Sequence, residues 1–298
     1  MAKRLKKISD QMAAVVADAS QGVVRVEGRR RLPATGIIWS SSGLIITANH
    51  VLKRDEGIKV GLPDGKTVPA QLVGRDHSTD TALISIDAQE LALLSRSIDD
   101  SEAVGNLVFA LGRPGKSIQA TLGIVSALGD SWRTRRGGQI DRYMQTDVLM
   151  YPGFSGGPLV GANGKLLGMN SSALVPGISV TIPASTLERV AQTLLTHGRI
   201  RRGYLGISTQ RVQLPRNIQK ELKQKMGLLV VSVEPDSPAE QGGIVLGDTI
   251  VGLEGKSIRS HDELLAQLVG DVVDKKVPVA MIRGGELLTI NVKIGERP

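Results

Sequence analysis

The stretch Tyr151–Leu159 reads YPGFSGGPL and places one hydroxyl, Ser155, among glycines. Gly153 lies two residues before the serine, and Gly156 and Gly157 follow it directly. Glycine permits a tight turn and lets another chain come close to the backbone. In such a turn, backbone N–H groups can point at the oxyanion that forms during acyl transfer. The stretch therefore predicts a serine nucleophile whose oxyanion hole is made by the N–H groups of Gly153 and Ser155.

The same stretch has two other interpretations. Serine and glycine are common in plain surface turns. Residues 153–157 (GFSGG) also fit the G-x-S-x-G pattern of α/β-hydrolases, in which the serine lies on a turn that runs directly into a helix. Here the pattern LVGANGKLLGM at residues 159–169 predicts a strand, a turn and a second strand instead. The sequence therefore favours a β setting for Ser155.

A nucleophilic serine needs a base and a group that orients the base. Of the four histidines in the chain, His50 follows an apolar, strand-like run at residues 44–48. Asp80 directly precedes another such run at residues 81–86. Strand edges hold side chains rigidly, so we predict His50 and Asp80 as the partners of Ser155. The chain order His, Asp, Ser is that of chymotrypsin and differs from the orders in subtilisin and the α/β-hydrolases.

Many ordered motifs resemble HtrA-type (high-temperature-requirement) serine proteases, which join a chymotrypsin-like protease domain to one PDZ domain. The resemblance begins near Val23 and implies a catalytic triad of His50, Asp80 and Ser155, each at its own motif. The motifs that carry it are GLIITANHVL, DHSTDTALISI, VFALGRPG, TLGIVSAL, MQTDVLMYPGFSGGPLV, RRGYLGI and VEPDSPAEQGGIVLGDTIVGLEGKSI.

Two other carboxylates lie close to these motifs. Asp76 is the rival partner for His50, but no apolar strand follows it directly. Asp147 belongs to the QTD element at residues 145–147, and we assign it a structural role. Neither is therefore placed in the triad.

Three features depart from the family pattern. The family usually has asparagine directly before the serine; here Phe154 stands there, which leaves an inactive resting conformation of the oxyanion loop open. Residues 34–36 (ATG) replace a Gly-Ser-Gly signature, a change that we interpret as neutral. Family trimers commonly use aromatic residues near the N-terminus, and residues 1–38 contain none. A homo-oligomer is expected, and whether it is a trimer stays open.

The resemblance also implies a primary pocket for the substrate. Residues about six before the nucleophile line the base of this pocket in the resembled fold. No carboxylate lies there, so we expect cleavage after small or medium aliphatic residues rather than after Arg or Lys. The expected pocket residues are Leu149 and Met150 at the base, with Asn170, Ser171 and Ser172 in the wall.

In PDZ domains, an extended peptide adds a strand to a sheet edge, and backbone N–H groups hold its terminal carboxylate. The motif GYLGI matches the carboxylate-binding loop of such domains. The expected peptide-binding residues are Tyr204, Leu205, Gly206 and Ile207.

Short apolar runs separated by Gly, Pro or Asp turns fill residues 22–128, which predicts an all-β barrel or sandwich. Their succession indicates two barrels with the active site between them. A helical pattern at residues 187–196 ends near Gly198, and the basic run 199–202 marks a domain boundary. We predict a mainly β chain with an amphipathic helix at residues 1–22, a chymotrypsin-like double β-barrel at residues 23–198 and a small α/β PDZ domain at residues 199–298.

Residues 129–138 (GDSWRTRRGG) form a polar, arginine-rich loop. In the resembled family, loops in this region relay occupancy of the PDZ domain to the active site. A simple hairpin loop explains the pattern equally well.

The composition limits the possible partners. The absence of cysteine excludes a disulfide scaffold and a thiolate-bound metal, and we expect neither a metal nor another cofactor. The net charge of +8 is compatible with nucleic acid or anionic lipid, but stacking aromatics and a basic helix are lacking. We interpret the charge as favouring solubility and expect no nucleic-acid partner.

No stretch approaches the ~18 uninterrupted apolar residues of a membrane span. The basic start MAKRLKK resembles part of a signal peptide but lacks the apolar run that must follow. The chain as written is therefore expected to be soluble. The resemblance suggests the cell envelope or periplasm, with the cytoplasm as the alternative.

Two functions of different classes remain at this point. The first is a serine endopeptidase that degrades unfolded or damaged proteins, with a PDZ domain that binds C-terminal peptides. The second is a proteolytically silent PDZ adaptor or binding protein. The residues at positions 50, 80 and 155 favour the enzyme, and Phe154 favours the adaptor.

Overall fold

The structure is a computed structural model that describes residues 2–96, 101–175, 177–199, 203–268 and 272–296. The chain divides into two compact units, Met1–Arg199 and Ile200–Pro298. Each unit is described by itself.

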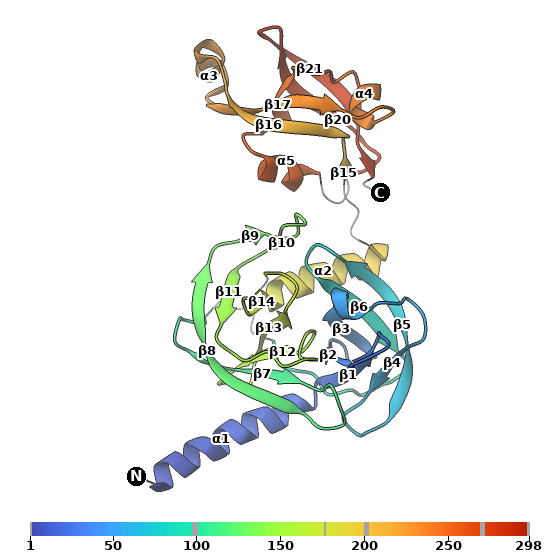
Figure 1. The fold of residues 1–298 in the computed structure, drawn as a ribbon, viewed down its shortest axis with the longest axis vertical. Coiled ribbons are helices and arrows are strands. Elements are labelled where there is room, and N and C mark those ends of the chain that lie inside the picture. Colours follow the sequence, from blue (N-terminus) through green and yellow to red (C-terminus); the bar gives the residue numbers. More distant parts are fainter. Residues whose placement is uncertain (1, 97–100, 176, 200–202, 269–271, 297–298) are drawn as a thin grey trace. The chain divides into compact units, whose positions relative to one another are not determined.

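The first unit contains two closed barrels of antiparallel strands, drawn in blue and in green in Figure 1. The strand order in the first barrel is β1-β2-β3-β6-β5-β4, and in the second it is β11-β14-β13-β12-β7-β8. The first barrel consists of β1 (Val23–Glu27), β2 (Ala34–Ile38), β3 (Leu44–Ala48), β4 (Ile58–Gly61), β5 (Thr67–Asp76) and β6 (Thr81–Ile86). The second consists of β7 (Leu107–Gly112), β8 (Gln119–Gly129), β11 (Tyr143–Thr146), β12 (Pro158–Gly161), β13 (Leu166–Ser171) and β14 (Val180–Pro183). The predicted chymotrypsin-like double barrel is confirmed.

Aliphatic side chains fill the first barrel because the chain has few aromatic residues. Ile37, Ile45, Ile46 and Leu83 are fully buried on neighbouring strands. The register pairs Ile37 with Ile46 across β2 and β3, and Ile46 with Leu83 across β3 and β6. β-Branched side chains pack well on a pleated, buried surface, which favours strands here.

The second barrel takes Phe154 into its core. This side chain is fully buried and belongs to a cluster with Val108, Val125 and Leu159, among others. Gly112 makes room for it, since a Cβ atom at Gly112 would lie 2.4 Å from the Phe154 ring. Phe154 therefore ties the loop before Ser155 to the barrel interior.

Two long helices belong to this unit. Helix α2 (Ala184–His197) ends at Gly198, which adopts a left-handed conformation with φ of 69° and donates its N–H to Leu194 O. Such a glycine is a common helix terminator. Helix α1 (Ala2–Ser20) leaves Leu5 and Ile8 exposed along its length.

Arg113, in the loop after β7, joins the end of α1 to the barrel. Its guanidinium donates to Ser20 O at 2.9 Å and to Val23 O at 2.8 Å. Burial lowers the pKa of Arg113 from its ordinary value. A cation next to the last carbonyls of a helix also complements the helix dipole.

The second unit is a small α/β domain built on a sheet with the order β16-β17-β18-β20-β21, in which β16 lies at one edge. Its strands are β15 (Gly203–Tyr204), β16 (Ile207–Gln213), β17 (Met226–Val233), β18 (Thr249–Leu253), β19 (Lys256–Ser257), β20 (Lys276–Arg283), β21 (Glu286–Lys293) and β22 (Gly295–Glu296). Its helices are α3 (Arg216–Leu222), α4 (Pro238–Gln241) and α5 (His261–Gln267). The predicted PDZ architecture is confirmed, although the sequence patterns did not predict α3 and α4.

Helix α5 begins after Ser260. The Ser260 hydroxyl accepts a hydrogen bond from Glu263 N, as an N-cap residue should. Among the helices that the structure describes, none is both long and apolar enough to cross a membrane.

Candidate active site

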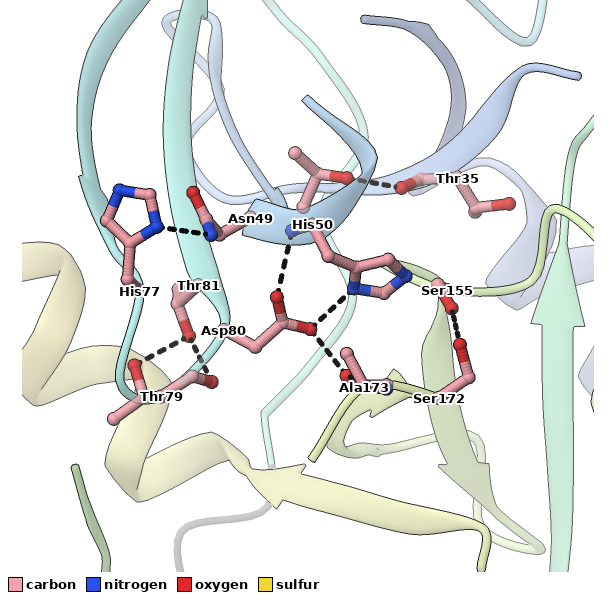
Figure 2. A network of polar contacts seen from close by, with 12 residues as sticks. Thr35, Asn49, His50, His77, Thr79, Asp80, Thr81, Ser155, Ser172 and Ala173 are labelled. Carbon is pink, nitrogen blue, oxygen red and sulfur yellow. Dashed lines mark hydrogen bonds and ion pairs between the residues drawn. The ribbon is translucent and has the colours of Figure 1, made fainter. Parts of the chain in front are cut away.

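His50 and Asp80 are brought together by the backbone that carries them. Strand β3 leads into a short 3₁₀ helix (Asn49–Val51), and Asn49 N donates to Asp80 O at 2.9 Å. His50 N donates to Asp80 Oδ1 at 2.8 Å, and His50 Nδ1 lies 2.7 Å from Asp80 Oδ2 (Figure 2). An ionised carboxylate only accepts hydrogen bonds, so Nδ1 carries the proton and Nε2 is left with a free lone pair. This is the tautomer that a general base requires.

A third donor fixes the carboxylate of Asp80. Ser171, which is fully buried at the end of β13, donates its hydroxyl to Asp80 Oδ2. Asp80 itself is 5% exposed. Its orientation is thus set by three contacts from two residues: two from His50, through its backbone and its ring, and one from Ser171.

The two rival carboxylates lie elsewhere. Asp76 accepts hydrogen bonds from the backbone and hydroxyl groups of Ser78 and Thr79, so it stabilises its own turn. Asp147 Oδ1 accepts from Ile124 N at 2.6 Å, which is a structural contact in the second barrel.

Ser155 lies in the loop before β12, and Figure 2 shows it beside the ring edge of His50 that faces away from Asp80. Its Oγ is 3.0 Å from Ser172 Oγ, and either hydroxyl can be the donor. If Ser172 donates, the proton of Ser155 remains available to His50. From the sequence, Ser172 is expected only in the pocket wall, and no local pattern predicts this contact.

The loop before Ser155 presents two backbone donors. Gly153 has a φ of 94°, and the next N–H, that of Phe154, is used by Tyr151 O at 3.0 Å. Within the part of the chain that the structure describes, the N–H groups of Gly153 and Ser155 donate to no protein acceptor. They are therefore available to a substrate oxyanion, as an oxyanion hole requires.

Thr35, on β2, supports this loop through hydrogen bonds. Its hydroxyl donates to Gly153 O at 2.6 Å and accepts from Arg113 N at 2.9 Å. Its backbone N–H donates to Ser155 O at 3.3 Å. The Thr35 carbonyl in turn accepts from the hydroxyl of Thr47 at 2.7 Å. The sequence analysis gave Thr35 no role, because its partners lie far away in the chain.

The residues predicted for the primary pocket occupy different environments. Leu149 is 58% exposed, and Met150 packs against the core of the second barrel. Asn170 is buried, and its amide donates to Pro158 O at 3.1 Å. Ser171 supports Asp80, as described above, whereas Ser172 is exposed next to Ser155. The specificity of this region stays a prediction.

The second unit contains a groove of about 430 Å³ between β16 and α5. Tyr204, Leu205, Gly206 and Ile207 all line it, together with apolar residues of α5 such as Leu264. Among the described residues, the N–H groups of Leu205 and Gly206 donate to no protein acceptor. The four residues predicted for peptide binding are thus brought together at one end of an edge strand.

Comparison with known proteins agrees with this architecture. Residues 34–169 match the model of the trypsin-like peptidase domain family, and residues 203–294 match that of the PDZ domain family. The crystal structure of a serine endoprotease from Yersinia pestis is 32% identical, has a TM-score of 0.79 and covers 96% of this chain and 98% of that one. This chain belongs to the HtrA-type serine proteases.

Other HtrA-type relatives are similar over most of the chain. The structure of HtrA-type protease AlgW with a tripeptide is 30% identical, with a TM-score of 0.76 and coverage of 96% and 97%. The probable periplasmic serine endoprotease DegP-like of Marinomonas is 36% identical over 91% of this chain and 59% of its own length. The periplasmic serine endoprotease DegP of Salmonella typhimurium is 35% identical over 87% and 55%. The chain thus spans somewhat more than half the length of these curated relatives.

Proposed function

We propose that this chain is a serine endopeptidase that cleaves unfolded or damaged proteins. The observation that carries the proposal is the hydrogen-bonded pair of His50 and Asp80 next to Ser155, whose loop offers two unused N–H donors. The proposed catalytic residues are His50, Asp80 and Ser155, and the proposed oxyanion donors are the N–H groups of Gly153 and Ser155.

The geometry supports the following acyl transfer. The Ser155 oxygen attacks the scissile carbonyl carbon while His50 Nε2 takes its proton, and Asp80 stabilises the imidazolium that forms. The negative charge on the carbonyl oxygen is bound by the two backbone donors. His50 then gives the proton to the leaving amine, the C–N bond breaks, and an acyl-enzyme remains. Water repeats the same steps, which releases the acid product and restores Ser155.

We further propose that residues 23–198 act as the protease domain and residues 199–298 as a PDZ domain, with the N-terminal helix in residues 1–22. The unused N–H groups of Leu205 and Gly206 support binding of a terminal carboxylate in the second domain. The periplasmic relatives support a location in the cell envelope or periplasm. Because these relatives are endoproteases of the same family, they also support polypeptide substrates and a homo-oligomer.

Hydrolysis of unfolded casein tests the proposal. Ser155→Ala and His50→Ala are each expected to lower the rate by about 10⁴-fold or more, because residues of a triad act as a unit. Asp80→Asn should cause a similar loss, since the amide no longer selects the required tautomer of His50. Ser232→Ala, at an exposed position on β17, is the matched control and should cleave at the wild-type rate. Normal turnover by Ser155→Ala would refute the assignment.

A silent adaptor is the second candidate. It is favoured if Ser155 is the donor in its contact with Ser172, because its proton is then not available to His50. If the wild-type chain binds peptides through its PDZ domain but cleaves no casein, the adaptor is correct.

A further inference from the structure

A cavity of about 180 Å³ opens beside the pair of His50 and Asp80. Two arginines from another part of the chain, Arg135 and Arg136, contribute to its lining. Both are exposed, and neither takes part in the mechanism proposed above. Their place next to the base of a protease raises the question of what they bind.

The two arginines are held there by a small hairpin, β9 (Trp132–Arg133) and β10 (Gln139–Ile140). Thr134, which is buried, donates its hydroxyl to Ser78 O at 2.7 Å, and Ser78 lies two residues before Asp80. Gly138 packs on the same residue, since a Cβ atom there would lie 2.5 Å from the Ser78 carbonyl. The tip of the hairpin is therefore fastened to the turn that carries the triad carboxylate.

The charges that line the cavity favour an anion. The charged groups in its lining are the guanidinium groups of Arg135 and Arg136 and the carboxylate of Asp80. Asp80 already accepts hydrogen bonds from His50 and Ser171. Within the described part of the chain, Arg135 forms no ion pair, whereas Arg136 already makes another interaction within the protein. Guanidinium groups bind carboxylates well because their N–H donors match the two oxygens.

The position of the cavity indicates which part of a substrate enters it. Ser172 contacts the nucleophile, and the residues that follow, Ala173 and Leu174, line the cavity. Since Leu174 follows Ser172 by only two positions, an extended substrate that lies along this segment should reach the cavity two or three residues from the cleaved bond.

We propose that Arg135 and Arg136 form a subsite for an acidic side chain of the substrate, two or three residues before the cleaved bond. This proposal rests on the proposed endopeptidase function and adds a second determinant to the expected aliphatic preference at the cleavage position. The hairpin supplies the charge, and its contact with Ser78 fixes where that charge lies.

The test uses capped peptides, amidated at the C-terminus, in which one Asp or its isostere Asn is moved from four residues before the cleaved bond to three residues after it. Exposed ion pairs contribute little individually, so the wild-type kcat/KM should favour Asp over Asn by about 3- to 10-fold. This preference should occur two or three residues before the bond and weaken at high salt.

Two double variants isolate the cause. Arg135→Ala/Arg136→Ala should remove the preference for Asp, and Arg135→Glu/Arg136→Glu should replace it with a preference for Lys. Arg4→Ala/Lys59→Ala removes two exposed cations outside the cavity lining and should retain the wild-type preference. A preference for Asp that survives in Arg135→Ala/Arg136→Ala, or one that appears only after the cleaved bond, would overturn the proposal.

Binding separates this proposal from the proposed function. In Ser155→Ala, which cannot cleave, fluorescence anisotropy with labelled Asp and Asn peptides should show the same ratio as the kcat/KM values. Equal dissociation constants, or no binding, would refute the acidic subsite. If the Asp peptide binds more tightly than the Asn peptide but the wild-type chain hydrolyses neither, the acidic subsite is supported and the proposed endopeptidase function is refuted.

Discussion

Thr35 is the residue that most directly supports the oxyanion loop. It contacts the carbonyls of Gly153 and Ser155, the two residues whose N–H groups are proposed to bind the oxyanion. Because each carbonyl accepts a hydrogen bond from Thr35, the backbone of this loop cannot rotate easily. Phe154 adds a hydrophobic anchor in the barrel core.

The first prediction concerns this support. Thr35→Val removes the donor to the Gly153 carbonyl and keeps the side-chain volume. An unpaired buried polar group costs about 1–3 kcal/mol, so we expect kcat/KM to fall by about 5- to 100-fold. The loss should appear in kcat, because the oxyanion is bound mainly in the transition state.

Thr35→Ser keeps the hydroxyl and is the control, with an expected kcat close to that of the wild type. If Thr35→Val lowers only the melting temperature and leaves kcat unchanged, Thr35 has a structural role alone and the account of the loop is wrong.

Motifs predict single residues better than they predict contacts. His50, Asp80 and Ser155 each lie in a recognisable local pattern, so the sequence alone indicates them. The hydroxyl of Thr35 and the carbonyl of Gly153 are 118 positions apart in the chain, and the hydroxyl of Ser171 and the carboxylate of Asp80 are 91 apart. Nothing local marks such partners, since only the closure of the two barrels brings them together.

At the scale of elements, the edge strand β16 and helix α5 make the peptide groove. One edge of β16 pairs with β17, and no other described strand pairs with its second edge, where His261 Nε2 lies 2.8 Å from Thr209 O. Leu264, Leu265 and Leu268 provide an apolar wall along the groove. This arrangement is suited to strand addition by a peptide with an apolar C-terminal residue.

The second prediction compares such a peptide with its C-terminal amide. Loss of the carboxylate leaves the donors of Leu205 and Gly206 poorly paired, at about 1–3 kcal/mol, so affinity should fall roughly 10- to 100-fold. Calorimetry with the Ser155→Ala chain, which cannot digest the ligand, measures both dissociation constants. Equal affinities would contradict the assignment of the loop.

Elements with strong local signals were predicted, whereas α3 and α4 were not. Helix α2 has a helical apolar pattern and a terminal glycine, and the strands of the barrels are bounded by turn residues. Helices α3 and α4 contain only seven and four residues. Each follows or begins at a proline, so their sequences read as turns, and the packing of the sheet decides their conformation.

At the scale of the whole molecule, the unfolding of each unit can be measured separately. Both tryptophans, Trp39 and Trp132, belong to the first unit. The second unit contains an ion pair in which the partly exposed Arg283 contacts both oxygens of the buried Asp248 at 2.8 Å. Burial alone would raise the pKa of Asp248, but the hydrogen bonds from Arg283 and from Val245 N hold it below its ordinary value.

The third prediction uses this pair. A lowered pKa in the folded state means that Asp248 stabilises the second unit above the unfolded pKa, near about 4, and that this contribution is lost as the pH falls through the folded pKa. Asp248→Asn should therefore lower the calorimetric melting temperature of the second unit at pH 7, by several degrees for each kcal/mol lost. The difference from wild type should narrow at acidic pH.

In Asp248→Asn, the unfolding of the first unit, followed by tryptophan fluorescence, should be the same as in the wild type. The control Asp236→Asn, at an exposed position, should leave the melting temperature of the second unit unchanged. A difference that widens as the pH falls would contradict the sign of the shift.

The central claim is that Ser155 is an activated nucleophile beside a working oxyanion hole. The most direct measurement is reaction of the folded chain with a fluorophosphonate, followed by mass mapping of the modified peptide. The account predicts one modification, at Ser155, which is absent in Ser155→Ala and strongly slowed in His50→Ala. A folded wild-type chain that is not modified, or one that is modified equally at another serine in Ser155→Ala, would contradict it.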